Sequence, residues 1–583
     1  MSTHFKFRFL WLLGSLTGSA FCLMAQIPQE DSRNVNVPNT NTHFTMPAYR
    51  TLAEWEAHKA KLRAQILFAA GLIPSPTKNP LNPVIFGRIE HSDYSIEKVH
   101  LETLPGYYLC GNLYRPRGRA GKFPGVLAPH GHWDYGRLEH QPLISVPLRC
   151  INLAKQGFVA FSYDMVGYND TIQTPHDFGS PREQLWGFGP LGLQLWNSIR
   201  ALDFLESLAD VDPQRLAVTG ESGGGTQTFL LGAVDDRVKY DAPVNMISTI
   251  MQGGGQCENA PGLRFDTFNV EIGAMMAPRP MLMVAATGDW TKNTPREEYP
   301  SVRSIYELYG KTDNLETVQI DAPHNYNQAS RERMYGFFGK RILGESKEVQ
   351  EARGVHVEKL QDMLVWQGRS LPKNALTYEQ LVEQWIAESK KQTDETRDAA
   401  VLRERLRLAL GTEWPERVLS ERAGERIVLS RAGKGDRVSG IQLGSGVPSI
   451  VVVDAGGAEA ARKIAGNSAL LLTVFQTGDA IAARDRSGPY FLTFNRSDDA
   501  NRVQDVLTAL AYLKQEGARD LRIVASGKAA IWAQFAAAAA SVPVAVEGKP
   551  DGFNGRDQDF IDQFFVPGIQ RAGGLEAVRR ILP

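Results

Sequence analysis

The stretch that decides the fold runs from Arg215 to Leu231. It reads Arg215-Leu216-Ala217-Val218-Thr219, then Gly220-Glu221-Ser222-Gly223-Gly224-Gly225, then Thr226-Gln227-Thr228-Phe229-Leu230-Leu231. The order is that of a buried strand, a tight turn and a helix. Glycines two residues before and after Ser222 relieve crowding, so this GxSxG pattern predicts a nucleophilic serine projecting from the turn. The alternative is an ordinary glycine-rich turn before a helix, which the flanking strand and helix make less fitting.

Short apolar segments alternate with helical patterns from about residue 96 to residue 343. The expected strands are Val126–Ala128, Val159–Phe161, Leu216–Val218, Met281–Val284 and Val318–Ile320. An amphipathic helix with Leu195, Leu202 and Leu208 separates the second strand from the third. This alternation predicts a mostly parallel sheet with helices on both faces, and it places the chemistry just beyond the carboxyl ends of strands.

A serine nucleophile needs a base and an orienting acid, because its hydroxyl is weak at its free pKa. In a strand-turn-helix hydrolase these residues follow the serine along the chain, each after a later strand. Asp289 follows the strand that starts at Met281, and His324 follows the strand that starts at Val318. Asp321 is the rival acid. We expect Asp289 and His324 to complete a triad with Ser222.

The oxyanion of acyl transfer needs preorganised donors. One is expected from the amide of Gly223, and the second from the loop Pro129-His130-Gly131-His132-Trp133, through Gly131 or His132. Five further residues are candidates for a substrate-binding mouth, with fold support as an equally good interpretation: Trp133, Glu221, Glu258, Arg264 and Trp290. Arg264 is also the candidate for reading a uronate carboxylate, the alternative being a surface salt bridge.

No metal or organic cofactor is expected from the sequence. His130 and His132 flank Gly131, but no acidic or histidine partner stands at a helical spacing beside them, and no CxxC or Cys/His ligand cluster is apparent. The chain has four cysteines, and removal of an N-terminal leader that contains Cys22 would leave Cys110, Cys150 and Cys257, a sparse, odd set in which at most one disulfide can form. Their pairing stays open at this point.

The chain of 583 residues has a formal net charge of −1 and a pI near 6.9, so no nucleic-acid partner is expected. Residues 1–25 have the layout of a secretory signal peptide, with Lys6 and Arg8 before an apolar run and a small-residue segment ending near Ala25. A membrane anchor fits less well because the apolar run is short. A lipoprotein signal at Cys22 is disfavoured by Phe21. We expect cleavage after Ala25, a secreted or periplasmic protein, and no stable membrane insertion.

The remaining chain divides by composition into four segments. Residues 26–95 form an N-terminal helical and extended segment, 96–344 the catalytic domain, 345–423 a charged helical connector, and 424–583 a second α/β domain. In this last part, Leu510–Leu513 and Leu521–Ala529 parallel Leu202–Leu205 and Leu216–Gly224, which places Gly527 at the nucleophile position. No histidine follows His356, so we interpret 424–583 as a degenerate, inactive hydrolase-like half. An ordinary α/β domain with convergent patterning is the alternative.

The motifs resemble those of one family. They are Pro129–His132, Tyr163-Asp164-Met165-Val166-Gly167-Tyr168, Leu191–Asn197, Gly220–Gln227, Thr287-Gly288-Asp289-Trp290-Thr291 and Ala322-Pro323-His324. Together they resemble bacterial acetyl xylan esterase-like members of the α/β-hydrolase superfamily over about residues 50 to 343. The resemblance implies secreted hydrolysis of carboxylic esters through a serine acyl-enzyme, commonly the deacetylation of plant polysaccharides. The triad then carries over as Ser222, Asp289 and His324.

Three alternatives stay open. Related folds cleave pectin methyl esters or glucuronoyl esters, and others are peptidases, although no run of repeated propeller strands gates this site. A non-enzyme built from two hydrolase-like halves that binds polysaccharide would explain the inactive second half. It would not explain why a serine, an acid and a base occur in order in the first half. The expected partner in each ester hypothesis is an ester-bearing carbohydrate.

Overall fold

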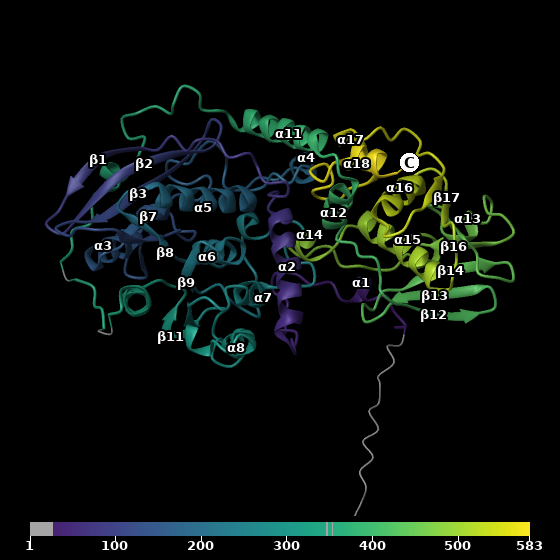
Figure 1. Cartoon of the computed structure of the whole chain (residues 1–583), viewed down its shortest axis with the longest axis horizontal. Coiled ribbons are helices and arrows are strands. Elements are labelled where there is room, and N and C mark those ends of the chain that lie inside the picture. Colours follow the sequence, from purple (N-terminus) through teal and green to yellow (C-terminus); the bar gives the residue numbers. More distant parts are fainter. Residues whose placement is uncertain (1–26, 346–347, 353, 583) are drawn as a thin grey trace, which may run out of the picture.

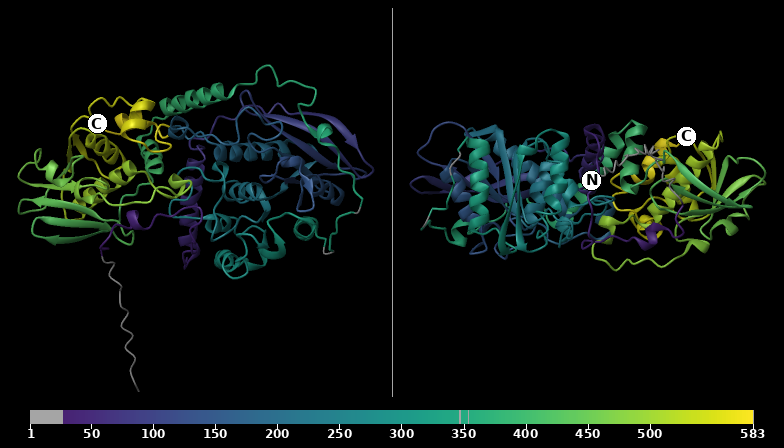
Figure 2. Two further views of the ribbon diagram at one scale, coloured as in Figure 1. Left: turned by 180° about the vertical axis from the view of Figure 1, so that it is seen from behind. Right: turned by 90° about the horizontal axis from the view of Figure 1, so that it is seen from below.

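The computed structural model describes residues 27–345, 348–352 and 354–582. The signal peptide expected at residues 1–25 lies outside them. Two β-sheets stand at opposite ends of an elongated molecule, and helix α2 (Leu52–Ala69) lies between them (Figures 1 and 2). Within the described ranges no helix combines the length and apolar character needed to cross a membrane.

The first sheet has nine strands in the order β1-β2-β3-β7-β4-β8-β9-β10-β11. Their bounds are β1 Val84–Glu90, β2 Tyr94–Leu104, β3 Tyr107–Pro116, β4 Phe123–Leu127, β7 Val159–Tyr163, β8 Val211–Glu221, β9 Val238–Val244, β10 Met281–Gly288 and β11 Leu315–Pro323. The first three strands and the β3–β7 pair are antiparallel, and every later pair is parallel. All five strands expected from the sequence lie in this parallel part. The sheet starts upstream of residue 96, because β1 pairs with β2 through Val84 and His100.

The interior parallel strands bury residues on both of their faces, whereas the edge strand β11 is mostly only half-buried. Leu127, Phe161 and Val218 belong to one hydrophobic cluster, whereas the intervening Ala128 and Ala160 belong to another on the opposite face. This is the continuous apolar pattern of a parallel sheet covered on both sides. The covering helices are α3 (Val146–Gln156) and α9 (Gln328–Phe338) on one face, and α5 (Pro190–Ser207), α6 (Gly223–Val234), α7 (Asn269–Ala274) and α8 (Glu298–Leu308) on the other.

The second sheet has seven strands in the order β12-β13-β14-β16-β15-β17-β18. Their bounds are β12 Val418–Ala423, β13 Arg426–Arg431, β14 Val438–Leu443, β15 Ile450–Val453, β16 Ala469–Thr473, β17 Arg522–Ala525 and β18 Ala545–Glu547. The pairs from β12 to β16 along this order are antiparallel, and the remaining three are parallel. Helices α15 (Asp498–Gln515) and α16 (Ala529–Ala539) cover it. The sheet begins at Val418, within the segment expected to be a connector.

The segment expected to be a charged helical connector contains two long helices, α11 (Tyr378–Glu395) and α12 (Ala399–Leu410). The smaller helices are α1 Ser32–Val35, α4 Pro181–Leu185, α10 Leu360–Met363, α13 Ala458–Ala461, α14 Phe491–Phe494, α17 Asp557–Gln563 and α18 Gly574–Ile581. Short strands β5 (His140–Gln141) and β6 (Ile144–Ser145) form a separate hairpin.

The two sheet-bearing parts of the chain are joined by buried polar contacts. Arg571 is 1% exposed and donates to the Gly71 carbonyl and the Ser389 hydroxyl. Farther along the junction, the backbone amides of Gly262 and Arg264 donate to the backbone carbonyls of Leu492 and Thr493. The α14 segment therefore lies against the loop that follows β9. The C-terminal part therefore supports a loop at the carboxyl edge of the first sheet.

Candidate active site

Ser222 lies at the turn between β8 and α6, with φ 56° and ψ −126°. Such a left-handed φ is costly for a residue with a side chain, and it persists where the surroundings enforce it. A side chain on Gly220 would meet the carbonyl oxygens of Gly224 and Pro129 at 2.6 Å, so this position tolerates only glycine. The strand, the turn and the helix thus present Ser222 as the sequence pattern predicts, half-buried at the carboxyl edge of the sheet.

Asp289 and His324 meet beyond the ends of β10 and β11. Nδ1 of His324 lies 2.8 Å from Oδ2 of Asp289, whose side chain is 2% exposed. The other carboxylate oxygen of Asp289 accepts from the amide and the hydroxyl of Thr291 at 2.7 and 2.5 Å. Asp321, the rival acid, is exposed and accepts from the hydroxyl of Thr287. Asp289 is therefore the carboxylate placed to orient the imidazole.

Two tryptophans flank His324. The Trp290 ring centroid lies 4.4 Å from that of His324, and its indole N–H donates to the carbonyl of Asn245. The Trp133 ring also stacks on the His324 ring, with 6.4 Å between the two ring centroids. Among the described residues, the buried Nε2 of His324 has no hydrogen-bond partner. The Ser222 hydroxyl likewise makes no hydrogen bond with them. The imidazole thus has one nitrogen held by an acid and one available for proton transfer.

The donors for an oxyanion are more restricted than the sequence suggests. Gly131 packs against Ser222, since a Cβ on it would lie 2.8 Å from the serine Cβ, but its N–H donates to Oε1 of Glu221 at 2.8 Å. The expectation that Gly131 supplies the oxyanion donor is therefore corrected, because that N–H is already used. Within the described chain, the amides of His132 and Gly223 have no recorded partner, and the His132 ring lies against Gly223. These two amides are the available donors.

Buried contacts fix the loop that bears these donors. Glu221 is fully buried, and its second oxygen accepts from Arg149, which also donates to the Pro129 carbonyl. His130 accepts from the Met165 amide through Nε2, and its Nδ1 lies 2.7 Å from the Gly131 carbonyl. Burial lowers the pKa of His130 to about 3, which keeps it neutral. These residues position the loop and do not face a substrate.

Three of the residues expected to contact substrate are buried and already paired within the protein, so these three expectations are wrong. Glu221 accepts from Gly131 and Arg149. Glu258 is 3% exposed and accepts from the Thr226 hydroxyl and the Gly254 amide. Arg264 is 1% exposed and donates to Asn259, Asn269 and backbone carbonyls, so it cannot read a uronate carboxylate. Trp133 and Trp290 remain beside His324.

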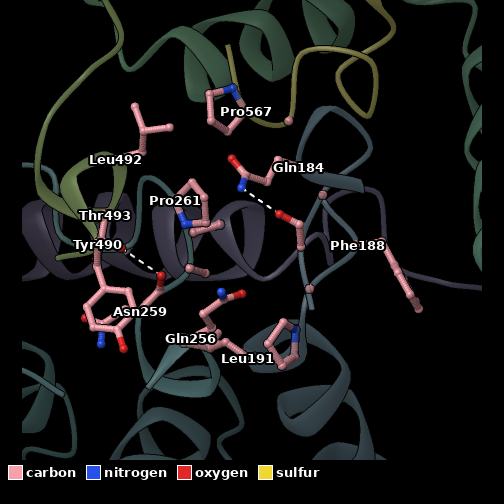
Figure 3. Close-up of a pocket in the computed structure, with 18 of the residues that line it drawn as sticks. Gln184, Phe188, Leu191, Gln256, Asn259, Pro261, Tyr490, Leu492, Thr493 and Pro567 are labelled. Carbon is pink, nitrogen blue, oxygen red and sulfur yellow. Dashed lines mark hydrogen bonds between the residues drawn. The ribbon is translucent and has the colours of Figure 1, made fainter. Parts of the chain in front are cut away.

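A cavity of about 320 Å³ lies where the C-terminal part meets the loop after β9 (Figure 3). Its wall combines aromatic rings with amides, including Phe68, Phe178, Tyr490, Gln256 and Asn259. The Thr493 hydroxyl donates to the Asn259 carbonyl at 2.7 Å, and the Tyr490 hydroxyl donates to the Gly254 carbonyl. This cavity could not be predicted from the sequence, because its walls come from segments far apart in the chain.

A second unpredicted feature joins three loops. A ring nitrogen of His132, a ring nitrogen of His176 and the Cys257 sulfur all lie within 4.8 Å of one another. The sequence showed no Cys/His cluster, because these ligand-type residues share no short spacing motif. Cys257, like Cys110 and Cys150, is a buried free thiol, so none of these three cysteines is in a disulfide.

Comparison with known proteins adds a resemblance in sequence and fold. No protein-family model matches the chain. The protein named "Putative hydrolase YtaP" from Bacillus subtilis is 25% identical over 301 residues, covering 48% of this chain and 99% of that protein. The acetyl esterase Axe7A from Xylanibacter ruminicola is 28% identical over 156 residues, covering 24% of this chain and 32% of that protein.

Among solved structures, the methylesterase BT1017 superposes with a TM-score of 0.51 at 28% identity. The match covers 59% of this chain and 78% of that structure. The mixed α/β architecture with its largely parallel sheet is that of the α/β-hydrolase type. In sequence and in fold, this chain therefore resembles hydrolases that act on esters.

Proposed function

We propose, taking that resemblance as a premise, that this chain is a serine hydrolase of carboxylic esters. The observation that carries the proposal is the 2.8 Å contact between Asp289 and His324 at the sheet edge that bears the strained Ser222 turn. Hydrogen bonding to Asp289 fixes the imidazole tautomer with a proton on Nδ1, which leaves Nε2 as a base. The free amides of His132 and Gly223 complete the requirements of acyl transfer.

In the proposed mechanism, His324 Nε2 removes the Ser222 proton as the serine oxygen attacks the ester carbonyl. The amides of His132 and Gly223 stabilise the oxyanion of the tetrahedral intermediate. The imidazolium protonates the leaving alcohol, which gives an acyl-serine. His324 then activates water to release the acid and restore the serine.

The substrate class we propose is an esterified carbohydrate, with acetyl groups on plant polysaccharide as the first candidate. Trp133 and Trp290 offer aromatic faces next to His324. The cavity beside Gln256 and Asn259 has no triad residue in its wall, but its apolar rings and amides suit a further sugar ring of the same polysaccharide. A neutral acetyl ester requires no cation in the site, which agrees with the internal role of Arg264.

A methyl ester is the second candidate, because the structural match at a TM-score of 0.51 is named a methylesterase. In that case the uronic acid of the carbohydrate would form the acyl-serine, and methanol would be the leaving alcohol. This alternative needs a group that reads a uronate other than the buried Arg264.

Wild type and Ser222→Ala should be assayed on 4-nitrophenyl acetate, acetylated xylan and methyl-esterified pectin, with acetate and methanol quantified. We expect serine-dependent release of acetate from xylan, with a loss of at least about 10³-fold in the variant. Methanol release alone would select the methyl ester. Absence of serine-dependent turnover, together with polysaccharide binding by both proteins, would replace the enzyme with a binding scaffold.

We propose further that the second sheet belongs to a degenerate hydrolase-like half. Its seven strands repeat the order and the directions of β1 to β9 of the first sheet. Gly527 follows β17 with φ 52°, as Ser222 follows β8 with φ 56°. Strands corresponding to β10 and β11, which bear the acid and the base, have no counterpart among the seven. This half would then act as a wall of the cavity.

Export is also a proposal, supported by the composition of residues 1–25. Expression of the full chain in a bacterial host and mass measurement of the exported protein test it. A mature N-terminus after Ala25 is expected, and retention of the intact leader in the cytoplasmic fraction would contradict it.

A further inference from the structure

The cluster of His132, His176 and Cys257 brings together three loops that surround Ser222. His132 comes from the loop after β4, His176 from the loop after β7, and Cys257 from the short helix Gln256–Glu258 after β9. Nε2 of His132 lies 3.0 Å from the Cys257 sulfur, and the two imidazole centroids are 5.1 Å apart. Imidazole and thiolate are the ligands that zinc prefers in proteins.

The hydrogen bonding of His176 is that of a metal ligand. Its Nδ1 lies 2.7 Å from the Val166 carbonyl, so Nδ1 carries the proton and Nε2 carries a lone pair. This Nε2 is buried and has no hydrogen-bond partner among the described residues. A buried polar atom without a partner is uncommon in native proteins and needs an explanation. A carbonyl that orients the second nitrogen is the usual arrangement behind a metal-binding histidine.

The separations suit one ion. Tetrahedral zinc with ordinary bond lengths holds a nitrogen and a sulfur ligand roughly 3.5 Å apart. The separations here are 3.0 Å for His132 and Cys257 and no more than 4.8 Å within the set, so they bracket that value. A hydrogen bond between His132 and the thiol accounts for two of the three residues but leaves the His176 nitrogen unexplained.

The surrounding charge also favours a cation. The charged side chains that act on Cys257 are carboxylates, Glu258 and Asp177. Glu258 is held in place by Thr226 and Gly254, so its charge is fixed close to the thiol. The His132 residue is exposed, which leaves one side of the cluster open to solvent.

We propose that His132, His176 and Cys257 form a three-ligand site for one borderline-soft divalent cation, with zinc as the first candidate and a solvent molecule in the fourth position. On binding, the Cys257 thiol loses its proton to solvent and the thiolate bonds to the ion, with no change of oxidation state. The ion ties together the loops after β4, β7 and β9. It thereby fixes His132, whose amide is an available oxyanion donor.

The test uses the full chain, treated with a chelator and then titrated with Zn²⁺, with bound metal measured by mass spectrometry after gel filtration. We expect one zinc per chain and a melting temperature that rises with zinc concentration. His176→Ala and Cys257→Ser should lower the affinity by more than the ~10–100-fold that loss of an outer partner costs. Cys150→Ser, at another buried thiol, should leave the stoichiometry unchanged.

A second measurement separates coordination from misfolding. Wild type loaded with Co²⁺ should show a thiolate-to-cobalt charge-transfer band, and a folded Cys257→Ser protein should lack it. No zinc retained by the wild type, or equal zinc in wild type and both ligand variants, would overturn the site. Neither readout involves ester turnover, so this result and that of the Ser222 assay are independent.

Discussion

Asp289 holds Nδ1 of His324 through one carboxylate oxygen while Thr291 occupies the other. Both carboxylate oxygens of Asp289 are therefore held by hydrogen bonds, and the carboxylate in turn orients the His324 imidazole. The pair joins the ends of two adjacent parallel strands, β10 and β11, so their relative position depends on the register of the sheet. A local motif around His324 alone would not determine the position of His324 relative to Asp289.

Asp289→Asn should preserve the fold and lower kcat by roughly 10³–10⁴-fold, because an amide no longer fixes the tautomer that leaves Nε2 basic. The control is Asp321→Asn, which removes an exposed carboxylate that accepts from the Thr287 hydroxyl. Steady-state kinetics on 4-nitrophenyl acetate decide between them. If Asp321→Asn were the damaging change, the acid would be misassigned.

Glu221→Gln should reduce both stability and kcat. The substitution leaves Arg149 buried without its partner, which costs on the order of 3–5 kcal/mol, and it loosens the loop that carries the His132 amide. Glu316→Gln is the control, because its pairs with Lys340 and Arg341 are partly exposed and such pairs contribute about 0–1 kcal/mol. Urea unfolding and kinetics should both be measured. An unchanged KM with a lower kcat distinguishes donor positioning from substrate contact.

Gly527→Ser in a Ser222→Ala background should not restore turnover. The new side chain enters open space, but the second half lacks a histidine, since none follows His356. Ser526→Ala in the wild-type background should leave kcat unchanged. Activity gained by the first variant or lost by the second would show that this half has its own chemistry.

The sequence predicts the site best where the chemistry follows from local order. Ser222 lies between a strand and a helix, and Asp289 and His324 each follow an apolar strand, so all three could be identified from short segments. Glu221, Glu258 and Arg264 could not be assigned correctly, because the partners that bury them come from distant loops. The His132, His176 and Cys257 cluster escaped for the same reason. Three loops meet there only once the parallel strands are side by side.

Strand β9 shows a second limit of prediction from sequence, which concerns secondary structure. Its sequence, Val238-Lys239-Tyr240-Asp241-Ala242-Pro243-Val244, includes charges and a proline that argue against a central strand. It nevertheless pairs with β8 on one side and β10 on the other. Tertiary context overrides local preference here. The consequence is that Asp241 is completely buried on an interior strand of the sheet, between β8 and β10.

Asp241 should make the protein less stable as the pH rises. Neither carboxylate oxygen has a hydrogen-bond partner in the described structure, and burial raises its pKa to about 8, although Arg279 partly opposes the shift. An unfolded aspartate has a pKa of about 3.9. Between these two values the folded state binds more protons than the unfolded state, so the free energy of unfolding falls with increasing pH. The full penalty above pH 8 is on the order of 5 kcal/mol.

Asp241→Asn removes this titration with little change in shape. Its free energy of unfolding, measured with urea from about pH 5 to about pH 9, should exceed that of wild type by only about 1.5 kcal/mol at the acid end, where the unfolded aspartate is already ionised, and by roughly 5 kcal/mol at the alkaline end. Asp236→Asn is the control, because that carboxylate is exposed and its pair with Arg63 holds its pKa below the ordinary value. Parallel curves for wild type and Asp241→Asn would mean that Asp241 is already charged in the folded protein. A steeper fall for wild type alone would identify this carboxyl as the group whose ionisation opposes folding.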